Sequence, residues 1–201
     1  MPWRSLGNWV YRKVEVKKVG IILGIIAVIV IVIAVAVASE PSEEIQPFSE
    51  QAVTVENVRA ALTKLTGTNV ELGDSITDIQ VSPYAGTENP DDFSVHVYFK
   101  PKNVWDEQYA MQIAVQTSIK AMEALFRNQA VGEVVMYEQL DFTHLYGYTE
   151  TETAVRLLML KATADRITDW EVVSDRAQSD YNTFFELAEL QYVHPAIANA
   201  L

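Results

Sequence analysis

Residues 93–100 read FSVHVYFK, and this stretch decides the fold class that we expect. Apolar and polar side chains alternate along it, and successive side chains of a β-strand point to opposite faces of a sheet. One face therefore belongs in a hydrophobic core, whereas the other, which carries His96 and Tyr98, remains open. The apolar face consists of Phe93, Val95, Val97 and Phe99.

Helix and strand patterns alternate on both sides of this strand. A helix that Thr54 caps and a strand over residues 76–81 precede it, and Pro101 ends it. After it we expect a long amphipathic helix to residue 127, strands over 134–142 and 151–161, a short helical or turn segment over 164–170 and a helix over 175–191. The order helix, strand, strand, helix, strand, strand, helix predicts an α+β domain over residues 52–201. Its sheet would have four strands, mainly antiparallel, with helices packed on one face.

A second feature is the apolar run VGIILGIIAVIVIVIAVAVA at residues 19–38, which contains no polar side chain. A helix of this length is about 30 Å long, which matches the hydrocarbon thickness of a bilayer. The sequence therefore predicts an N-terminal transmembrane helix that contacts membrane lipid.

The residues up to the end of this apolar run carry a net positive charge, whereas the residues after it carry a net negative charge. Residues 1–38 carry five basic residues and one acidic residue, a net charge of +4, so the formal total of −12 leaves −12 − 4 = −16 for residues 39–201. Basic residues beside a membrane helix stay in the cytoplasm. We therefore expect a short basic cytoplasmic tail over 1–18, a single-pass signal anchor over 19–38 and an extracytoplasmic domain at the cell membrane. Residues 39–51, with two prolines and four glutamates, predict an extended acidic linker.

Two forms of processing at the N-terminus would change this prediction. Residues 36–38 read AVA before Ser39, which is a pattern that signal peptidase cuts. The sequence KKVG at residues 17–20 resembles the basic-plus-glycine processing site of prepilins, although Ile25 stands where bacterial type IV pilins typically carry glutamate. Cleavage at the first site would release the domain, and cleavage at the second would suggest a pilin-like filament subunit.

Several common chemistries are absent from the sequence. The chain has no cysteine, which excludes a disulfide scaffold, a thiolate metal site and a cysteine nucleophile. It also lacks the phosphate-binding, dinucleotide-binding, zinc-protease and serine-hydrolase motifs. His96, His144 and His194 fall on a strand, in a turn and in the C-terminal tail, and we treat them as independent. We therefore assign no catalytic residue, no cofactor and no metal ligand, and the acidic charge argues against nucleic-acid binding.

The candidate interaction face consists of His96, Tyr98, Glu150 and Glu152 on the open side of the sheet. Glu150 and Glu152 are two residues apart on an expected strand and so project to one face. Glu138 or Asp141 opposite them would complete a carboxylate cluster, whereas a solvated face with Arg156 as counter-charge is the simpler interpretation.

These observations favour an anchored domain that acts as a binding or assembly module for a protein partner or for further copies of the chain. Two alternatives stay open. One is a secreted or anchored hydrolase or metal-dependent enzyme that uses the carboxylates and histidines. The other is a pilin-like surface subunit.

Overall fold

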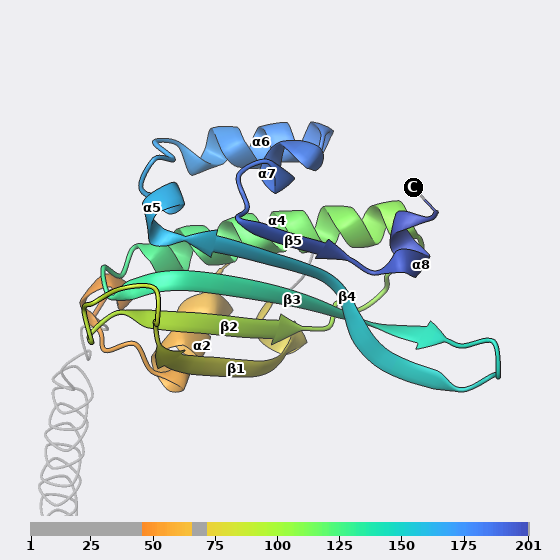
Figure 1. Cartoon of the computed structure of the whole chain (residues 1–201), viewed down its shortest axis with the longest axis horizontal. Helices are drawn as coiled ribbons and strands as arrows, with labels where there is room; N and C mark the ends of the chain where they lie inside the picture. Colours follow the sequence, from red (N-terminus) through yellow and green to blue (C-terminus); the bar gives the residue numbers. More distant parts are fainter. Residues whose placement is uncertain (1–45, 66–71, 201) are drawn as a thin grey trace, which may run out of the picture. The chain divides into compact units, whose positions relative to one another are not determined.

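The computed structural model describes residues 46–65 and 72–200 (Figure 1). They form one five-stranded sheet with the strands in sequence order, β1-β2-β3-β4-β5. Neighbouring strands run antiparallel except for β2 and β3, which are parallel. The strands are β1 (Ile76–Pro83), β2 (Phe93–Phe99), β3 (Val131–Thr143), β4 (Thr149–Leu160) and β5 (Leu190–Val193).

Helices precede β1, follow β5 and fill the connections from β2 to β3 and from β4 to β5, whereas β1–β2 and β3–β4 are joined by loops without a helix. The long helix α4 begins after Asp106, whose side chain accepts a hydrogen bond from the amide of Tyr109 at 2.7 Å, and Thr54 caps α2 in the same way. The cap at Thr54 agrees with the sequence prediction. The helices are η1 (Phe48–Glu50), α2 (Val55–Thr63), α3 (Leu72–Ser75), α4 (Glu107–Phe126), α5 (Lys161–Ala164), α6 (Trp170–Ser179), α7 (Asn182–Phe185) and α8 (Pro195–Ala198).

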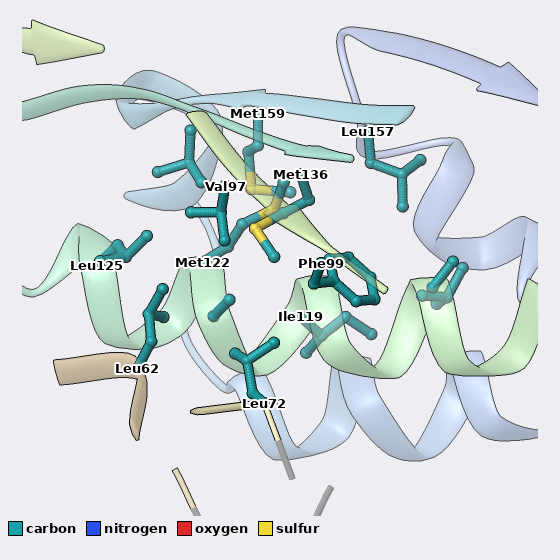
Figure 2. Packing of buried hydrophobic residues seen from close by; sticks show 14 of the residues in the cluster. Leu62, Leu72, Val97, Phe99, Ile119, Met122, Leu125, Met136, Leu157 and Met159 are labelled. Carbon is teal, nitrogen blue, oxygen red and sulfur yellow. The ribbon is translucent and has the colours of Figure 1, made fainter. Parts of the chain in front are cut away.

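The core lies between α4 and one face of the sheet. Val97 and Phe99 of β2 and Met136 of β3 are buried against Ile119 and Met122 of α4, and Figure 2 shows these side chains interleaved. Leu62 of α2 and Leu72 of α3 extend the same cluster beneath α4, while α6 packs along α4. The helix α4 is thus enclosed by the sheet and by other helices, which explains why buried residues occur around most of its circumference.

The expected sheet of four mainly antiparallel strands is wrong in two respects. The sheet has five strands and is mixed, because β2 and β3 are parallel neighbours. Parallel neighbours need a crossover, and α4 supplies it by carrying the chain from the end of β2 back to the start of β3. The α+β class itself agrees with the sequence prediction.

The membrane helix in the expected fold also requires correction. Residues 19–38, on which that prediction rests, lie outside the described residues. Within 46–65 and 72–200, no helix is both long enough and apolar enough to cross a bilayer. The structure therefore supports an α+β fold with a five-stranded mixed sheet, and no membrane-spanning helix belongs to its described part.

The fifth strand arises where a single helix over 175–191 was expected. Asp180 has extended backbone angles and ends α6, and its carboxylate accepts hydrogen bonds from the backbone and side-chain nitrogens of Asn182, both at 3.0 Å. The chain then forms the short helix α7 and pairs with β4 through β5. The last two residues of the expected helix, 190 and 191, thus belong to the edge strand β5.

The first described residues belong to the same packed structure. Phe48 packs against the core, and the side chain of Asn128 donates hydrogen bonds to the backbone oxygens of Phe48 and Gln51 at 2.7 and 2.9 Å. The helix η1, which falls within the predicted 39–51 linker, is therefore fastened to the turn between α4 and β3.

Candidate functional site

The sheet face opposite α4 carries a row of aromatic and basic side chains across four neighbouring strands. The register aligns Tyr98 with Tyr137, Tyr137 with Arg156, and Arg156 with Tyr192. The rings of Tyr98 and Tyr137 stack with their centroids 4.3 Å apart, and the Arg156 guanidinium lies 5.8 Å from the centre of the Tyr192 ring. We call these four residues the tyrosine–arginine row.

Beside this row, hydrogen bonds hold His96 in one orientation. Its Nδ1 lies 3.1 Å from the Tyr137 hydroxyl and its Nε2 lies 3.0 Å from the Ser94 hydroxyl. Ser94 in turn donates its proton to Glu133 at 2.5 Å. Since the serine proton goes to the carboxylate, Nε2 of His96 is the donor to Ser94 and Nδ1 accepts from Tyr137.

This proton order bears on the hydrolase alternative. A serine nucleophile donates its proton to a histidine base, and here the direction is reversed. Ser94 is also buried, with only 5% of its surface exposed. The arrangement therefore fixes the shape of the face and does not activate a nucleophile.

Arg156 lines a shallow hollow of about 380 Å³. Its Nε is shielded from solvent and has no hydrogen-bond partner. Among the ion pairs of residues 46–65 and 72–200, none includes Arg156. The guanidinium therefore has no carboxylate partner within the described residues. The hollow is lined by Tyr137, Glu152, Thr153, Arg156 and Tyr192.

Burial and neighbouring charge adjust the acidity of this row. Burial raises the pKa of Tyr137, the neighbouring Tyr98 adds to the rise, and Arg156 opposes it. The Tyr137 hydroxyl therefore stays protonated at neutral pH and acts as a hydrogen-bonding group, not as a base.

The second pair of predicted residues lies elsewhere. Glu150 and Glu152 sit opposite Phe142 and Leu140 at the far end of the β3–β4 hairpin. There Glu152 meets two histidines: Nε2 of His144 lies 2.9 Å from one of its carboxylate oxygens, and Nε2 of His194 lies 3.5 Å from the other. Glu150 also approaches Nε2 of His144, at 3.5 Å. We call these four residues the histidine–glutamate cluster.

Ring contacts and backbone hydrogen bonds orient both histidines of the cluster. The His144 ring stacks on Tyr148 and the His194 ring stacks on Phe142, with centroids 4.5 and 4.1 Å apart. Nδ1 of His194 accepts the amide proton of Ala196 at 3.2 Å as the N-cap of α8. The neutral His194 ring therefore carries its proton on Nε2, facing Glu152.

Asp141 and Glu138, the two carboxylates considered as partners of Glu150 and Glu152, lie elsewhere in the structure. Asp141 accepts hydrogen bonds from Lys100 and Thr151, both at 2.6 Å, and these bonds lower its pKa. Glu138 points into the core with both oxygens buried and without a hydrogen bond, and burial raises its pKa well above the usual value. Neither joins Glu150 and Glu152.

The structure thus brings His96 together with Tyr98, and Glu150 together with Glu152, but it does not bring the two pairs together. Sequence reasoning missed the partnership of His144 with His194, which are 50 positions apart and meet only through the fold. It placed Arg156 as a counter-charge for the glutamates, whereas the register aligns Arg156 with Tyr137 and Tyr192.

Comparisons with known proteins do not assign the chain to a family. No protein-family model matches the chain, and neither a curated protein nor a solved structure matches it. Functional inference therefore rests on the geometry described above.

Proposed function

We propose that the domain is a binding module that recognises a protein partner through the open sheet face. The observation that carries this proposal is the tyrosine–arginine row, which places three tyrosine side chains and one guanidinium side by side on adjacent strands. Tyrosine and arginine are enriched among the residues that contribute most to protein–protein binding.

The neighbouring row on this face is apolar, which also favours a protein surface as the ligand. Val135 of β3, Leu158 of β4 and Leu190 of β5 are aligned by the register; Val135 is already buried, Leu158 is half-buried and Leu190 is exposed. A partner that covers both rows would remove apolar and aromatic area from water while the tyrosine hydroxyls keep polar contacts. Such a combination suits a protein better than a small polar solute.

Arg156 suggests which group of the partner lies at the centre. It makes no ion pair with a described carboxylate, and its Nε lacks a hydrogen-bond partner. A guanidinium binds a carboxylate through two parallel hydrogen bonds, which a lysine cannot reproduce. We infer that the partner inserts an aspartate or glutamate side chain into the hollow between Tyr137 and Tyr192.

The test compares two arginine substitutions in the full-length chain, purified with its partners from the cells that produce it. Arg156→Ala should lower recovery of a specific partner about 30-fold, because losing an interface residue of this kind costs about 2 kcal/mol. Arg156→Lys should give an intermediate loss. Quantitative mass spectrometry of the co-purified proteins measures the change.

Arg176→Ala is the matched control, since Arg176 is an exposed arginine on α6 and not on the open face. Its partner set should equal that of the unmodified chain. Equal recovery with Arg156→Ala, when its thermal unfolding is unchanged, would refute the assignment of the open face as the binding surface.

A further inference from the structure

We propose that the histidine–glutamate cluster binds a divalent transition-metal ion, with His144, Glu150 and Glu152 as its ligands. This site lies at the end of the β3–β4 hairpin, which extends past the neighbouring strands in Figure 1. It goes beyond the proposed function of the open face, although Glu152 also lines the hollow around Arg156. The inference rests on ligand geometry, shielding of the ligand atoms and the way the fold orients them.

The spacing of the donor atoms fits one ion. One ligand atom from each of His144, Glu150 and Glu152 can be chosen so that all three lie within 4.8 Å of one another. The Nε2 atom of His144 lies 2.9 and 3.5 Å from the nearest oxygens of Glu152 and Glu150. Ligands about 2.0–2.1 Å from a zinc ion are separated by about 3.3 Å in a tetrahedron. The two distances from His144 are close to this edge length.

Two of these atoms lack a satisfactory partner in the protein. Nε2 of His144 and Oε1 of Glu152 are both shielded from solvent, and neither makes a hydrogen bond, although they lie only 2.9 Å apart. Buried polar atoms normally have a partner. A cation placed between a histidine nitrogen and a carboxylate oxygen would satisfy both atoms together.

The hairpin holds the three ligands in register. Glu150 and Glu152 lie on one side of β4, and the turn that follows β3 returns His144 toward them. In this turn the amide of His144 donates to the oxygen of Tyr148 at 2.9 Å, and Gly147 adopts a positive φ of 84°. With His144 stacked on Tyr148, the site needs little ordering when an ion binds.

His194 is a positioning residue in this site. Its Nδ1 accepts the Ala196 amide proton, so a neutral ring cannot offer Nε2 as a ligand and instead directs an N–H toward Glu152. At 3.5 Å this contact is longer than an ordinary hydrogen bond, and a small shortening when Glu152 binds an ion would make it one. Partners that hydrogen-bond to a ligating carboxylate orient it and strengthen metal binding, so His194 would act on Glu152 without contacting the ion.

The ligand set favours a zinc-like ion over calcium or magnesium. One imidazole nitrogen and two carboxylates suit zinc, whereas calcium takes six to eight oxygen ligands and magnesium keeps several waters. Three protein ligands leave at least one coordination position, which water or a group of another molecule would fill.

The test measures zinc binding by the tag-free, full-length chain. After dialysis against chelator-treated buffer, Zn²⁺ is titrated in competition with a chromophoric chelator, and bound zinc is counted by elemental mass spectrometry. We expect one zinc ion per chain. His144→Ala and Glu152→Gln should abolish this binding, and Glu150→Gln should weaken it.

His194→Asn separates positioning from folding. Asparagine is a good N-cap and can still accept the Ala196 amide, but its shorter side chain cannot supply the ring N–H to Glu152. Zinc affinity should fall about tenfold to 100-fold while metal-free unfolding stays unchanged.

His96→Ala is the matched histidine control, since His96 lies on the open face and contacts Ser94 and Tyr137. Its zinc binding should equal that of the unmodified chain. The proposal is overturned by the absence of stoichiometric zinc, by undiminished binding in His144→Ala, or by an equal loss in His96→Ala.

Discussion

At the scale of single residues, the unusual group is Glu138. It stands on β3 in phase with Val134 and Met136, both of which are buried, and it is 1% exposed with no hydrogen bond to either oxygen. Burial disfavours the charged form and raises the pKa of this carboxyl well above its usual value of 4.5. The native state therefore keeps the proton that the unfolded chain releases near that value.

This difference predicts a stability that falls with rising pH. Below pH 4.5 the carboxyl is neutral in both states, and as the pH rises toward the folded-state pKa the unfolded chain binds fewer protons and becomes favoured. Glu138→Met should increase the free energy of unfolding by about 1–3 kcal/mol at pH 8 and by less at pH 5. Chemical denaturation at both pH values measures this change.

The exposed Glu186→Gln serves as the control for this prediction, because it removes a carboxyl without affecting the core. Its stability should follow the unmodified chain at both pH values. If Glu138→Met gave the same gain at pH 5 and pH 8, or reduced stability at both, the buried carboxyl would not be the source of the pH dependence.

The place of Glu138 was predictable from the sequence, whereas the meeting of His144 and His194 was not. Period-two alternation from Val134 through Met136 puts Glu138 on the apolar face, so the strand pattern already argued against Glu138 as a possible partner of Glu150 and Glu152. His144 and His194 become neighbours only because the β3–β4 hairpin and α8 are brought together by β5 pairing. No pattern of neighbouring residues in the sequence predicts that His144 and His194 lie close together.

At the scale of helices and strands, the sequence predicted the elements that are specified by residues close together in the chain. The strand over 93–99 follows directly from alternation, and the cap at Thr54 follows from a side chain that can accept a backbone amide proton. The predicted helix over 175–191 failed because Asp180 interrupts it and because residues 190–193 gain hydrogen bonds from β4. Tertiary pairing decided the conformation of those last residues.

Asn128 provides a test of how η1 is held. Its side chain makes three hydrogen bonds, two to the oxygens of Phe48 and Gln51 and one from the amide of Ala130 at 3.0 Å. Asn128→Ala leaves three backbone groups without this partner and should lower the free energy of unfolding by about 2–4 kcal/mol. Denaturant unfolding measures the loss.

Hydrogen exchange distinguishes the local effect from the global one. Asn128→Asp keeps an oxygen that accepts from Ala130 but loses the two donors, so protection around residues 48–51 should fall more than protection in β2. Equal loss of protection in both segments would contradict a local fastening of η1.

At the scale of the whole molecule, the sequence prediction contained neither the fifth strand nor the parallel pairing of β2 with β3. A helix between two strands is compatible with several strand orders, and only the crossover over the core face makes β2 and β3 neighbours. That pairing aligns Tyr98 with Tyr137 and so creates the tyrosine–arginine row. The expected location outside the cytoplasm rests on residues 1–38 and stays a prediction.

The central claim is that the open sheet face binds a protein partner around Arg156. The most direct measurement places a photo-crosslinking amino acid at Tyr98 in the full-length chain, within the cells that produce it, and a matched probe at the exposed Gln178 of α6. The proposal predicts one discrete crosslinked product from position 98, lost in Arg156→Ala and absent from position 178. A product that persists in Arg156→Ala, or no product from position 98, would contradict the claim.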